Sequence, residues 1–302
     1  MSQDNLSIEN NVILIGATGM LGTDLYTELT KRGWNVIAPD RSDIDLEDVR
    51  TVESYFLFAK PNWIINTAAY TAVDNAENDE FRANLINATG AFSLSRQSRF
   101  YKAGFIHIST DFVFDGTKNS PYTEEDEPHP LSVYGKSKRQ GEILVMNENP
   151  NSIIVRTSWL FGTNGKCFPK TILRAALDNK PLKVVNDQIG SPTYTRDLAI
   201  AIVNLMEKDT PPGYYHIANK GQVSWYEFAK FVLETYGVNY EIQPITSSEW
   251  QAPASRPKSS VLSTSKYESL GFPSLPDWKD AVQRFMQDLR NAPDAELFFP
   301  KG

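Results

Sequence analysis

The stretch NVILIGATGMLG, residues 11–22, decides the fold of this chain. Its first five residues form an apolar run that predicts a buried strand, and the helical spacing that follows predicts a helix to Lys31. Between them, Gly16, Gly19 and Gly22 are spaced G-x-x-G-x-x-G. Small residues let the backbone turn tightly and approach a pyrophosphate, and a helix N-terminus offers it free N–H groups. A glycine-rich turn without a ligand is the alternative, but the flanking strand and helix favour a dinucleotide site.

The alternation of short apolar strands with longer helical patterns continues to about residue 160. Further strands are predicted at residues 35–39, 63–66, 105–109 and 152–157, and helices at 46–59, 80–101 and 133–147. Strands and helices in this order are joined by right-handed crossovers, which give a parallel sheet with helices on both faces.

The regular alternation of strand and helix patterns ends beyond Trp159. There the sequence predicts helices at residues 168–178, 196–207 and 225–236, strands at 182–185 and 214–217, and a loop at 251–265. We therefore predict an α/β protein with a Rossmann-type doubly wound parallel sheet and a smaller C-terminal substrate-binding lobe. The predicted division is a flexible N-terminal tail at 1–10 and a dinucleotide-binding core at 11–160. Residues 161–302 are predicted to form mainly the substrate lobe, with elements that return to the core.

Composition narrows the class of partner and the compartment. The 302 residues are 41% hydrophobic and 22% charged, which is ordinary for a globular protein. A net charge of -7 argues against nucleic acid or an anionic membrane as the main partner, so an anionic substrate needs a local basic pocket. Cys167 is the one cysteine and is predicted to be a small buried hydrophobe in a reducing compartment. Because the polar first ten residues lack the features of a secretory signal, we expect a cytoplasmic protein.

The ends of the second and third strands carry candidate cofactor contacts. Asp40 ends the second strand, where an acidic side chain can bind the ribose hydroxyls of adenosine. Arg41 follows at once and can face a 2′-phosphate or simply solvent, so the pair does not decide between NADPH and NADH. Asp45-Leu46 is placed beside the adenine, and Ala68-Ala69 ends the third strand with residues small enough for close approach of the cofactor.

A proton-transfer constellation follows the fourth strand. Tyr134 and Lys138 are four residues apart, so they share one helix face, whereas Lys136 points away. Reduction of a ketone needs a proton for the new alkoxide, and a tyrosine with its ordinary pKa of about 10 is poorly matched to neutral pH. We expect the ammonium of Lys138 to lower the pKa of Tyr134 and also to hold the nicotinamide ribose. Thr110, at the strand end, can hydrogen-bond the substrate oxygen or the phenol.

Five longer motifs carry a family resemblance. They are NTAAYTAVD at 66–74, STDFVF at 109–114, RTSW at 156–159, NDQIGSPT at 186–193 and RPKSS at 256–260. With the glycine turn and the Tyr/Lys pair, they resemble the dTDP-4-dehydrorhamnose reductase family of the extended short-chain dehydrogenase/reductase superfamily. The resemblance runs from about Asn11 to Phe285.

The resemblance implies a reaction and a set of site residues. Hydride from NADPH or NADH would reduce the 4-keto group of dTDP-4-dehydro-L-rhamnose to give dTDP-L-rhamnose, with Tyr134 as proton donor and Thr110 tuning it. The expected catalytic residues are Thr110, Tyr134 and Lys138. The expected cofactor contacts are Gly16, Thr18, Gly19, Met20, Leu21, Gly22, Asp40, Arg41, Asp45, Leu46, Ala68, Ala69, Tyr70, Thr71, Tyr134 and Lys138. The expected substrate contacts are Val73, Thr110, Asp111, Tyr134, Trp159, Asp187, Gln188 and Arg256.

Several of these residues keep a second interpretation. A large aromatic residue such as Trp159 after a strand is usually core, although sugars stack on aromatic faces. Arg256 can bind a diphosphate or form a surface ion pair. Asp187 and Gln188 can contact the ligand or only fix a turn.

The sequence also predicts what the protein lacks and leaves rivals open. Part of the family has a metal-bridged dimer, but the corresponding stretch reads Tyr194-Thr195-Arg196 with no carboxylate until Asp197, and the three histidines are scattered, so we predict no metal. The sequence does not decide whether the chain forms a homodimer. One rival is a related nucleotide-sugar epimerase or dehydratase, although Phe112 stands where dehydratases typically have Glu. The other is a non-catalytic subunit similar to the regulatory subunit of methionine adenosyltransferase.

Overall fold

The computed structural model describes residues 10–56, 60–208 and 210–299 of the chain. The flexible tail predicted for residues 1–10 lies outside these ranges except for Asn10, as does the end of the helix predicted at 46–59.

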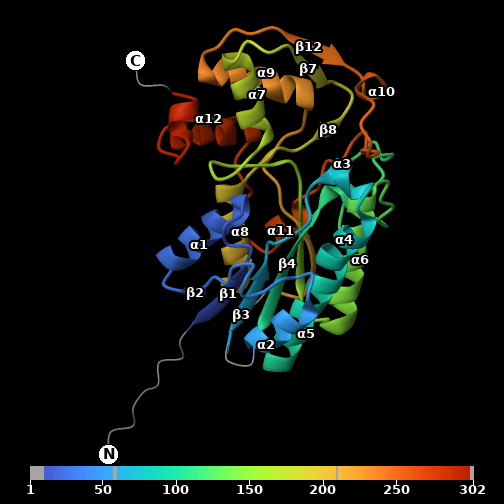
Figure 1. Ribbon diagram of the computed structural model, residues 1–302, viewed down its shortest axis with the longest axis vertical. Coiled ribbons are helices and arrows are strands. Elements are labelled where there is room, and N and C mark those ends of the chain that lie inside the picture. The colour runs from blue at the N-terminus through green and yellow to red at the C-terminus, as the bar shows by residue number, and fades with distance from the viewer. Residues whose placement is uncertain (1–9, 57–59, 209, 300–302) are drawn as a thin grey trace, which may run out of the picture.

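A six-stranded parallel sheet forms the centre of the lower part of the molecule in Figure 1. Its strands are β1 (Asn11–Ile15), β2 (Asn35–Ile37), β3 (Trp63–Asn66), β4 (Gly104–Thr110), β5 (Ile153–Thr157) and β10 (Gly213–His216), in the spatial order β10-β5-β4-β3-β1-β2. The chain leaves β1 for one edge and returns to its other side at β3, so the strand order reverses between these two strands. Such a reversal opens a crevice at the carboxyl ends of the strands, and the predicted doubly wound fold is confirmed.

Helices cover both faces of the sheet because successive strand residues point to opposite sides. Val12 and Leu14 belong to the apolar cluster under α1 (Met20–Lys31) and α8 (Thr195–Glu207). Ile13 and Ile15 belong to the cluster on the other face, with α2 (Val49–Phe56), α5 (Ala91–Tyr101) and α6 (Val133–Glu148). Both α8 and β10 follow residue 160, yet they pack with the first half of the chain.

The helix predicted at residues 80–101 is interrupted. The structure has α4 (Glu80–Asn84), a π-helical stretch at Leu85–Gly90 and then α5. Within that stretch, the Asn87 amide accepts from the Tyr70 N–H at 2.8 Å and donates to the Tyr70 carbonyl at 3.1 Å and to Ser137 Oγ at 2.9 Å. A π-turn inserts one residue and rotates the helix, which brings this side chain to the edge of the site.

The upper lobe in Figure 1 contains α7 (Phe168–Leu177), α9 (Trp225–Tyr236) and α12 (Trp278–Leu289), and its buried side chains form an apolar core separate from those of the sheet. In the same lobe, β7 (Leu182–Val185) is paired in parallel to β12 (Ile242–Ile245). The shorter elements are α3 (Val73–Ala76), β6 (Leu160–Phe161), β8 (Ile189–Gly190), β9 (Thr193–Tyr194), β11 (Val223–Ser224), α10 (Ser247–Trp250) and α11 (Ser265–Ser269), with 3-10 turns at Asp111–Val113 and Ala295–Leu297. Helix α9 begins at a capping box of Ser224 and Glu227 and ends at Gly237, whose φ is 91°.

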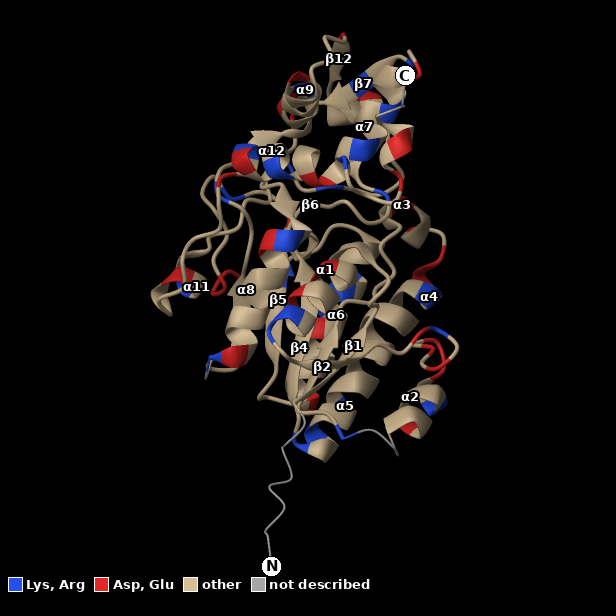
Figure 2. Ribbon diagram, turned by 90° about the vertical axis from the view of Figure 1, so that its left-hand side faces the viewer, with Lys and Arg blue, Asp and Glu red and all other residues tan. Residues whose placement is uncertain are grey.

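The surface carries charges of both signs. In the view of Figure 2, Lys and Arg alternate with Asp and Glu over both lobes. Cys167 is buried at the start of α7. In the described part of the chain, every helix is too short or too polar to cross a bilayer.

Candidate active site

A cavity of about 890 Å³ lies at the carboxyl ends of β1, β3, β4 and β5, beneath the upper lobe. Most of the residues predicted from the sequence line it. They are Gly16, Thr18, Gly19, Met20, Leu21, Gly22, Asp40, Arg41, Asp45, Leu46, Ala68, Ala69, Thr71, Val73, Thr110, Asp111, Tyr134, Lys138, Trp159 and Arg256. Tyr70, Asp187 and Gln188 are not among the lining residues.

The turn at Gly16, Gly19 and Gly22 is too tightly packed for side chains at its first and last glycines. Gly16 has a φ of 80°, and a Cβ added there would lie 2.8 Å from the Ala68 nitrogen. A Cβ on Gly22 would lie 2.0 Å from the Gly16 carbonyl oxygen, so a side chain at either position would close the turn. Gly19 precedes α1 and provides no side-chain cap. The turn therefore fits a pyrophosphate against the N-terminus of α1.

The far end of the cavity, at β2, is polar. The Asp40 carboxylate accepts from the Ser42 N–H at 2.7 Å and from Ser42 Oγ at 2.6 Å, and these bonds lower its pKa. Arg41 is paired with Glu47, which also accepts from Arg82 at 2.9 Å. A 2′-phosphate would have to compete with Glu47 for Arg41, whereas a ribose hydroxyl could donate to Asp40 Oδ2, because the bonds from Ser42 go to Oδ1.

Tyr134 is buried at the centre of the cavity wall, and its ring meets the edge of Phe112 at a centroid distance of 5.7 Å. The pKa of Tyr134 is raised to about 12, mainly by burial and to a smaller extent by the charge of Asp111, while a hydrogen bond with Thr110 opposes the rise. The expected lowering of this pKa by Lys138 is not found: Lys138 is not among the groups that shift it, and desolvation of the phenolate exceeds the effect of the Thr110 hydrogen bond. The consequence is a phenol that keeps its proton at neutral pH, as a proton donor must.

Lys138 is a buried amine one helical turn beyond Tyr134. Its Nζ donates to the Ile108 carbonyl at 2.6 Å and lies 3.5 Å from His107 Nε2. Burial lowers the pKa of Lys138 to about 8, and the charge of Glu142 opposes this shift. A lysine with such a pKa can exchange a proton near neutral pH.

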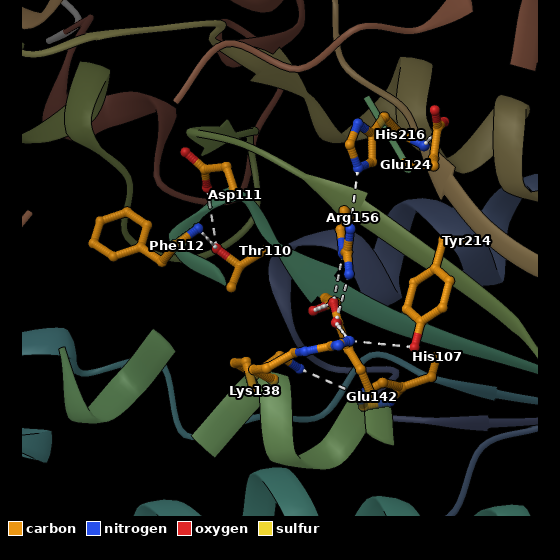
Figure 3. A network of polar contacts seen from close by, with 12 residues as sticks. His107, Thr110, Asp111, Phe112, Glu124, Lys138, Glu142, Arg156, Tyr214 and His216 are labelled. Atoms are coloured by element: carbon orange, nitrogen blue, oxygen red, sulfur yellow. Dashed lines mark hydrogen bonds and ion pairs between the residues drawn. The ribbon is translucent and has the colours of Figure 1, made fainter. Parts of the chain in front are cut away.

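A buried ion-pair network lies behind these side chains (Figure 3). Arg156 Nε and Nη2 each donate to Glu142 at 2.8 Å, and Ser109 Oγ donates to the same carboxylate at 2.6 Å. Arg139 adds a contact of 3.1 Å to Glu142, and Arg156 Nη1 lies 3.4 Å from His216 Nε2. The network fixes β4, β5, β10 and α6 relative to one another. Arg156 belongs to the RTSW motif, whereas no sequence motif marks Glu142, which lies eight residues after Tyr134 on the same helix.

Asp111 connects the site to the chain returning from the upper lobe. Its carboxylate accepts from Thr110 Oγ1 at 3.1 Å and from Ser260 Oγ. The side chain is fully buried, and burial raises the pKa of Asp111 to about 6.

Two stacked tryptophans form the wall of the cavity under the lobe. Trp159 and Trp225 lie face to face, with ring centroids 3.5 Å apart and planes within 7°. Trp159 has a φ of 46°, which is rare for a bulky residue and marks a locally strained backbone. A Cβ on Gly190 would lie 2.3 Å from the Trp159 ring. Trp225 was missed by the sequence analysis because an aromatic residue at the start of a helix is usually core.

The remaining predicted residues serve mainly to hold loops. Arg256 donates to Asp74 at 2.9 Å and so links its loop to α3, while still facing the cavity. Asp187 accepts from Ser247 N–H at 2.9 Å, and Gln188 donates to Ser247 Oγ at 2.9 Å. These two residues fix the start of α10, which favours the turn interpretation. The backbone of Tyr70 is held by Asn87, as described above.

Within the described ranges, no group of three or more His, Cys, Asp or Glu side chains is placed to hold a metal ion. The absence of a metal stays a prediction.

Comparisons with known proteins agree with this geometry. The family model "RmlD substrate binding domain" matches residues 10–291. The chain is 40% identical over 283 residues to the spore coat polysaccharide biosynthesis protein SpsK of Bacillus subtilis, covering 94% of this chain and 99% of the relative. It is 37% identical to a dTDP-4-dehydrorhamnose reductase of Mycolicibacterium smegmatis, covering 90% and 84% of the two chains.

Solved structures give the same picture. The crystal structure of dTDP-4-dehydrorhamnose reductase from Bacillus anthracis in complex with NADP superposes with a TM-score of 0.90 at 36% identity, covering 93% of this chain and 100% of that one. UDP-glucose 4-epimerase of Thermus thermophilus, in complex with NAD, reaches a TM-score of 0.82 at 20% identity over 93% and 99% of the two chains, which shows a shared fold only.

Proposed function

The chain belongs to the dTDP-4-dehydrorhamnose reductase family, whose RmlD substrate binding domain model it matches, and on that premise we propose that it reduces the 4-keto group of dTDP-4-dehydro-L-rhamnose. The product is dTDP-L-rhamnose. NADPH or NADH, when bound along the glycine turn, supplies the hydride. The structure of a relative with NADP supports this class of cofactor.

The observation that carries the proposal is the placement of Tyr134. It is buried in the cavity wall beside Thr110, at a pKa that keeps the phenol protonated. The phenol gives its proton to the carbonyl oxygen as that oxygen becomes an alkoxide, which is a stronger base than the phenolate. Thr110 would stabilise the phenolate by turning its hydroxyl from Asp111 to the phenolate oxygen, and Lys138, while protonated, would supply a positive charge one turn further along α6.

Other residues of the cavity orient the sugar nucleotide. The stacked Trp159 and Trp225 line the cavity and together offer an aromatic wall against which the apolar side of a deoxysugar can rest. Arg256 offers a guanidinium to the diphosphate, at the expense of its bond to Asp74. Asp111 and Val73 complete the wall around the reacting carbon.

The dehydratase alternative needs an acid/base pair, whereas Phe112 packs its ring against Tyr134 at the second position of such a pair. The similarity to SpsK supports a further step in which the product sugar enters a polysaccharide. We also place the enzyme in the cytoplasm on the basis of its cysteine usage.

The proposal is tested with purified protein, NADPH or NADH, and a panel of dTDP-linked 4-keto-6-deoxy sugars. We expect the absorbance of the reduced nicotinamide to fall only when such a keto sugar is added, and dTDP-glucose serves as the matched control without a ketone. Constant absorbance with every keto sugar would contradict the proposal. Association with a synthetase subunit in the absence of turnover would instead favour the regulatory-subunit alternative.

A further inference from the structure

Lys138 lies in an unusual environment for an ammonium group. It is buried, and among the described residues its closest polar partners are the Ile108 carbonyl and the His107 ring. Glu142, one turn further along α6, is the nearest carboxylate along the helix, but it is occupied by Arg156, Ser109 and Arg139. The charge of Lys138 is therefore not neutralised by a contact of its own.

The orientation of Asn66 can be assigned from its neighbours. The Ala68 backbone N–H, which can only donate, lies 3.1 Å from Asn66 Oδ1. The other end of the same amide, Nδ2, therefore faces His107 Nδ1 at 3.1 Å and donates to it. Both side chains are almost completely buried, so the buried amide has no water to turn toward.

This orientation fixes the tautomer of His107. If Nδ1 accepts a hydrogen bond, a neutral imidazole carries its proton on Nε2. Burial, and secondarily the charge of Lys138, hold the pKa of His107 well below its usual range, so the ring is neutral at neutral pH. The Nε2–H then points at Lys138 Nζ, 3.5 Å away.

An N–H facing an ammonium is unfavourable, whereas an N–H facing a neutral amine can donate to its lone pair. The other charged groups packed nearby do not reverse this preference, because Glu142 on α6 and Arg156 on β5 form a bidentate pair with each other. We propose that Asn66 and His107 are positioning residues that, through the locked tautomer, favour the neutral amine of Lys138. The chain of contacts begins at Ala68 in the cofactor cavity, so it joins the cofactor-facing backbone to the proposed catalytic lysine.

The inference rests on the proposed function only for the role of Lys138; the tautomer can be measured without turnover. The chain has three histidines, so a two-bond ¹H–¹⁵N correlation spectrum of the ¹⁵N-labelled protein resolves every ring. The exposed His129 is assigned by His129→Gln. We expect His107 to be neutral with its proton on Nε2. A proton on Nδ1, or an imidazolium at neutral pH, would overturn the proposal.

The second experiment changes Asn66, the residue that sets the tautomer of His107. Asn66→Asp keeps the shape of the amide but can only accept, so it should move the His107 proton to Nδ1 and leave Nε2 as an acceptor for the Lys138 ammonium. The fall of kcat/KM at alkaline pH, which follows loss of the Lys138 proton, should then shift upward by about one pH unit. Asn149→Asp places the same change at a buried asparagine that bonds Ser98, far along the chain from this network, and should not shift the profile.

A changed tautomer with an unshifted profile would overturn the proposal. Absence of turnover in the wild-type protein would remove the proposed function instead, while the spectrum of the wild-type rings would still decide this inference.

Discussion

At the scale of single residues, burial controls the ionisable groups of the site more strongly than charge does. Tyr134 and Asp111 both have raised pKa values and Lys138 has a lowered one, and in each case loss of water is the largest cause. Sequence spacing correctly placed Tyr134 and Lys138 on one helix face, but it could not show how completely that face is buried from water. That is why the direction expected for the pKa of Tyr134 was wrong.

Asp111 gives a stability test of the same effect. Because its pKa is about 6 in the folded chain against an ordinary value of 3.8, ionisation costs the fold stability as pH rises through this window. This loss of stability is absent when the pH is below the ordinary pKa of 3.8, and it is complete above about pH 6. We expect Asp111→Asn to raise the free energy of unfolding at pH 8 by about 1–3 kcal/mol, with the gain shrinking toward pH 4.

Urea unfolding of Asp111→Asn at several pH values measures this gain. Asp48→Asn is a matched control of opposite sign, since Asp48 is only half-buried and Arg50 lowers its pKa to about 2. If Asp111→Asn were no more stable than the parent at pH 8, or equally stabilised at every pH, burial of the charge would not be the cause.

At the scale of elements, the apolar pattern predicted the regular part of the fold well. The strand expected at residues 63–66 and the helix expected at 225–236 have those bounds in the structure. The helix expected at 80–101 differs, because the π-helical stretch is set by bonds of Asn87 to Tyr70 and Ser137, which lie far away in sequence. Tertiary contacts of this kind leave no periodic signal.

The same limit applies to the site. The glycine turn and the Tyr/Lys pair are local motifs, so spacing was enough to identify them. Trp225 and Glu142 join the cavity through partners on other elements, and only the fold brings those partners together. Asp187 and Gln188 line no part of the cavity, because their side chains are used to hold α10.

Gly190 in β8 lies against the Trp159 ring, and the other partner of that ring is Trp225 at the start of α9. A methyl group at this position would overlap the Trp159 ring, which is already stacked on Trp225 and cannot retreat in that direction. Gly190→Ala should therefore displace Trp159 and reduce kcat/KM for the keto sugar by roughly tenfold to a hundredfold. The coupled near-ultraviolet circular dichroism of the tryptophan pair should weaken as well.

Trp250→Phe controls for the loss of any tryptophan signal, because Trp250 is exposed on α10. An unchanged dichroism spectrum and unchanged kinetics in Gly190→Ala would show that Trp159 is not held in this way.

At the scale of the whole molecule, the sheet and the upper lobe have separate apolar cores, and the cavity lies where they meet. Segment 254–260 crosses this boundary. It bonds the sheet side through Arg256 to Asp74 and through Ser260 to Asp111, and its Ser260 N–H donates to the Ile189 carbonyl of β8. The cofactor side of the cavity is built by the sheet, whereas Trp225 comes from the lobe. With a net charge of -7, the chain would need local cations, such as Arg256, to bind the anionic sugar nucleotide that we propose as its substrate.

The account depends most on Tyr134 as the proton donor, and the rate of NAD(P)H oxidation by Tyr134→Phe with the keto sugar tests it most directly. We predict a fall in kcat of about 10²- to 10⁴-fold relative to the parent chain while the cofactor still binds, because the phenyl ring preserves the packing and removes the acid. Turnover at the parental rate by Tyr134→Phe would contradict the account.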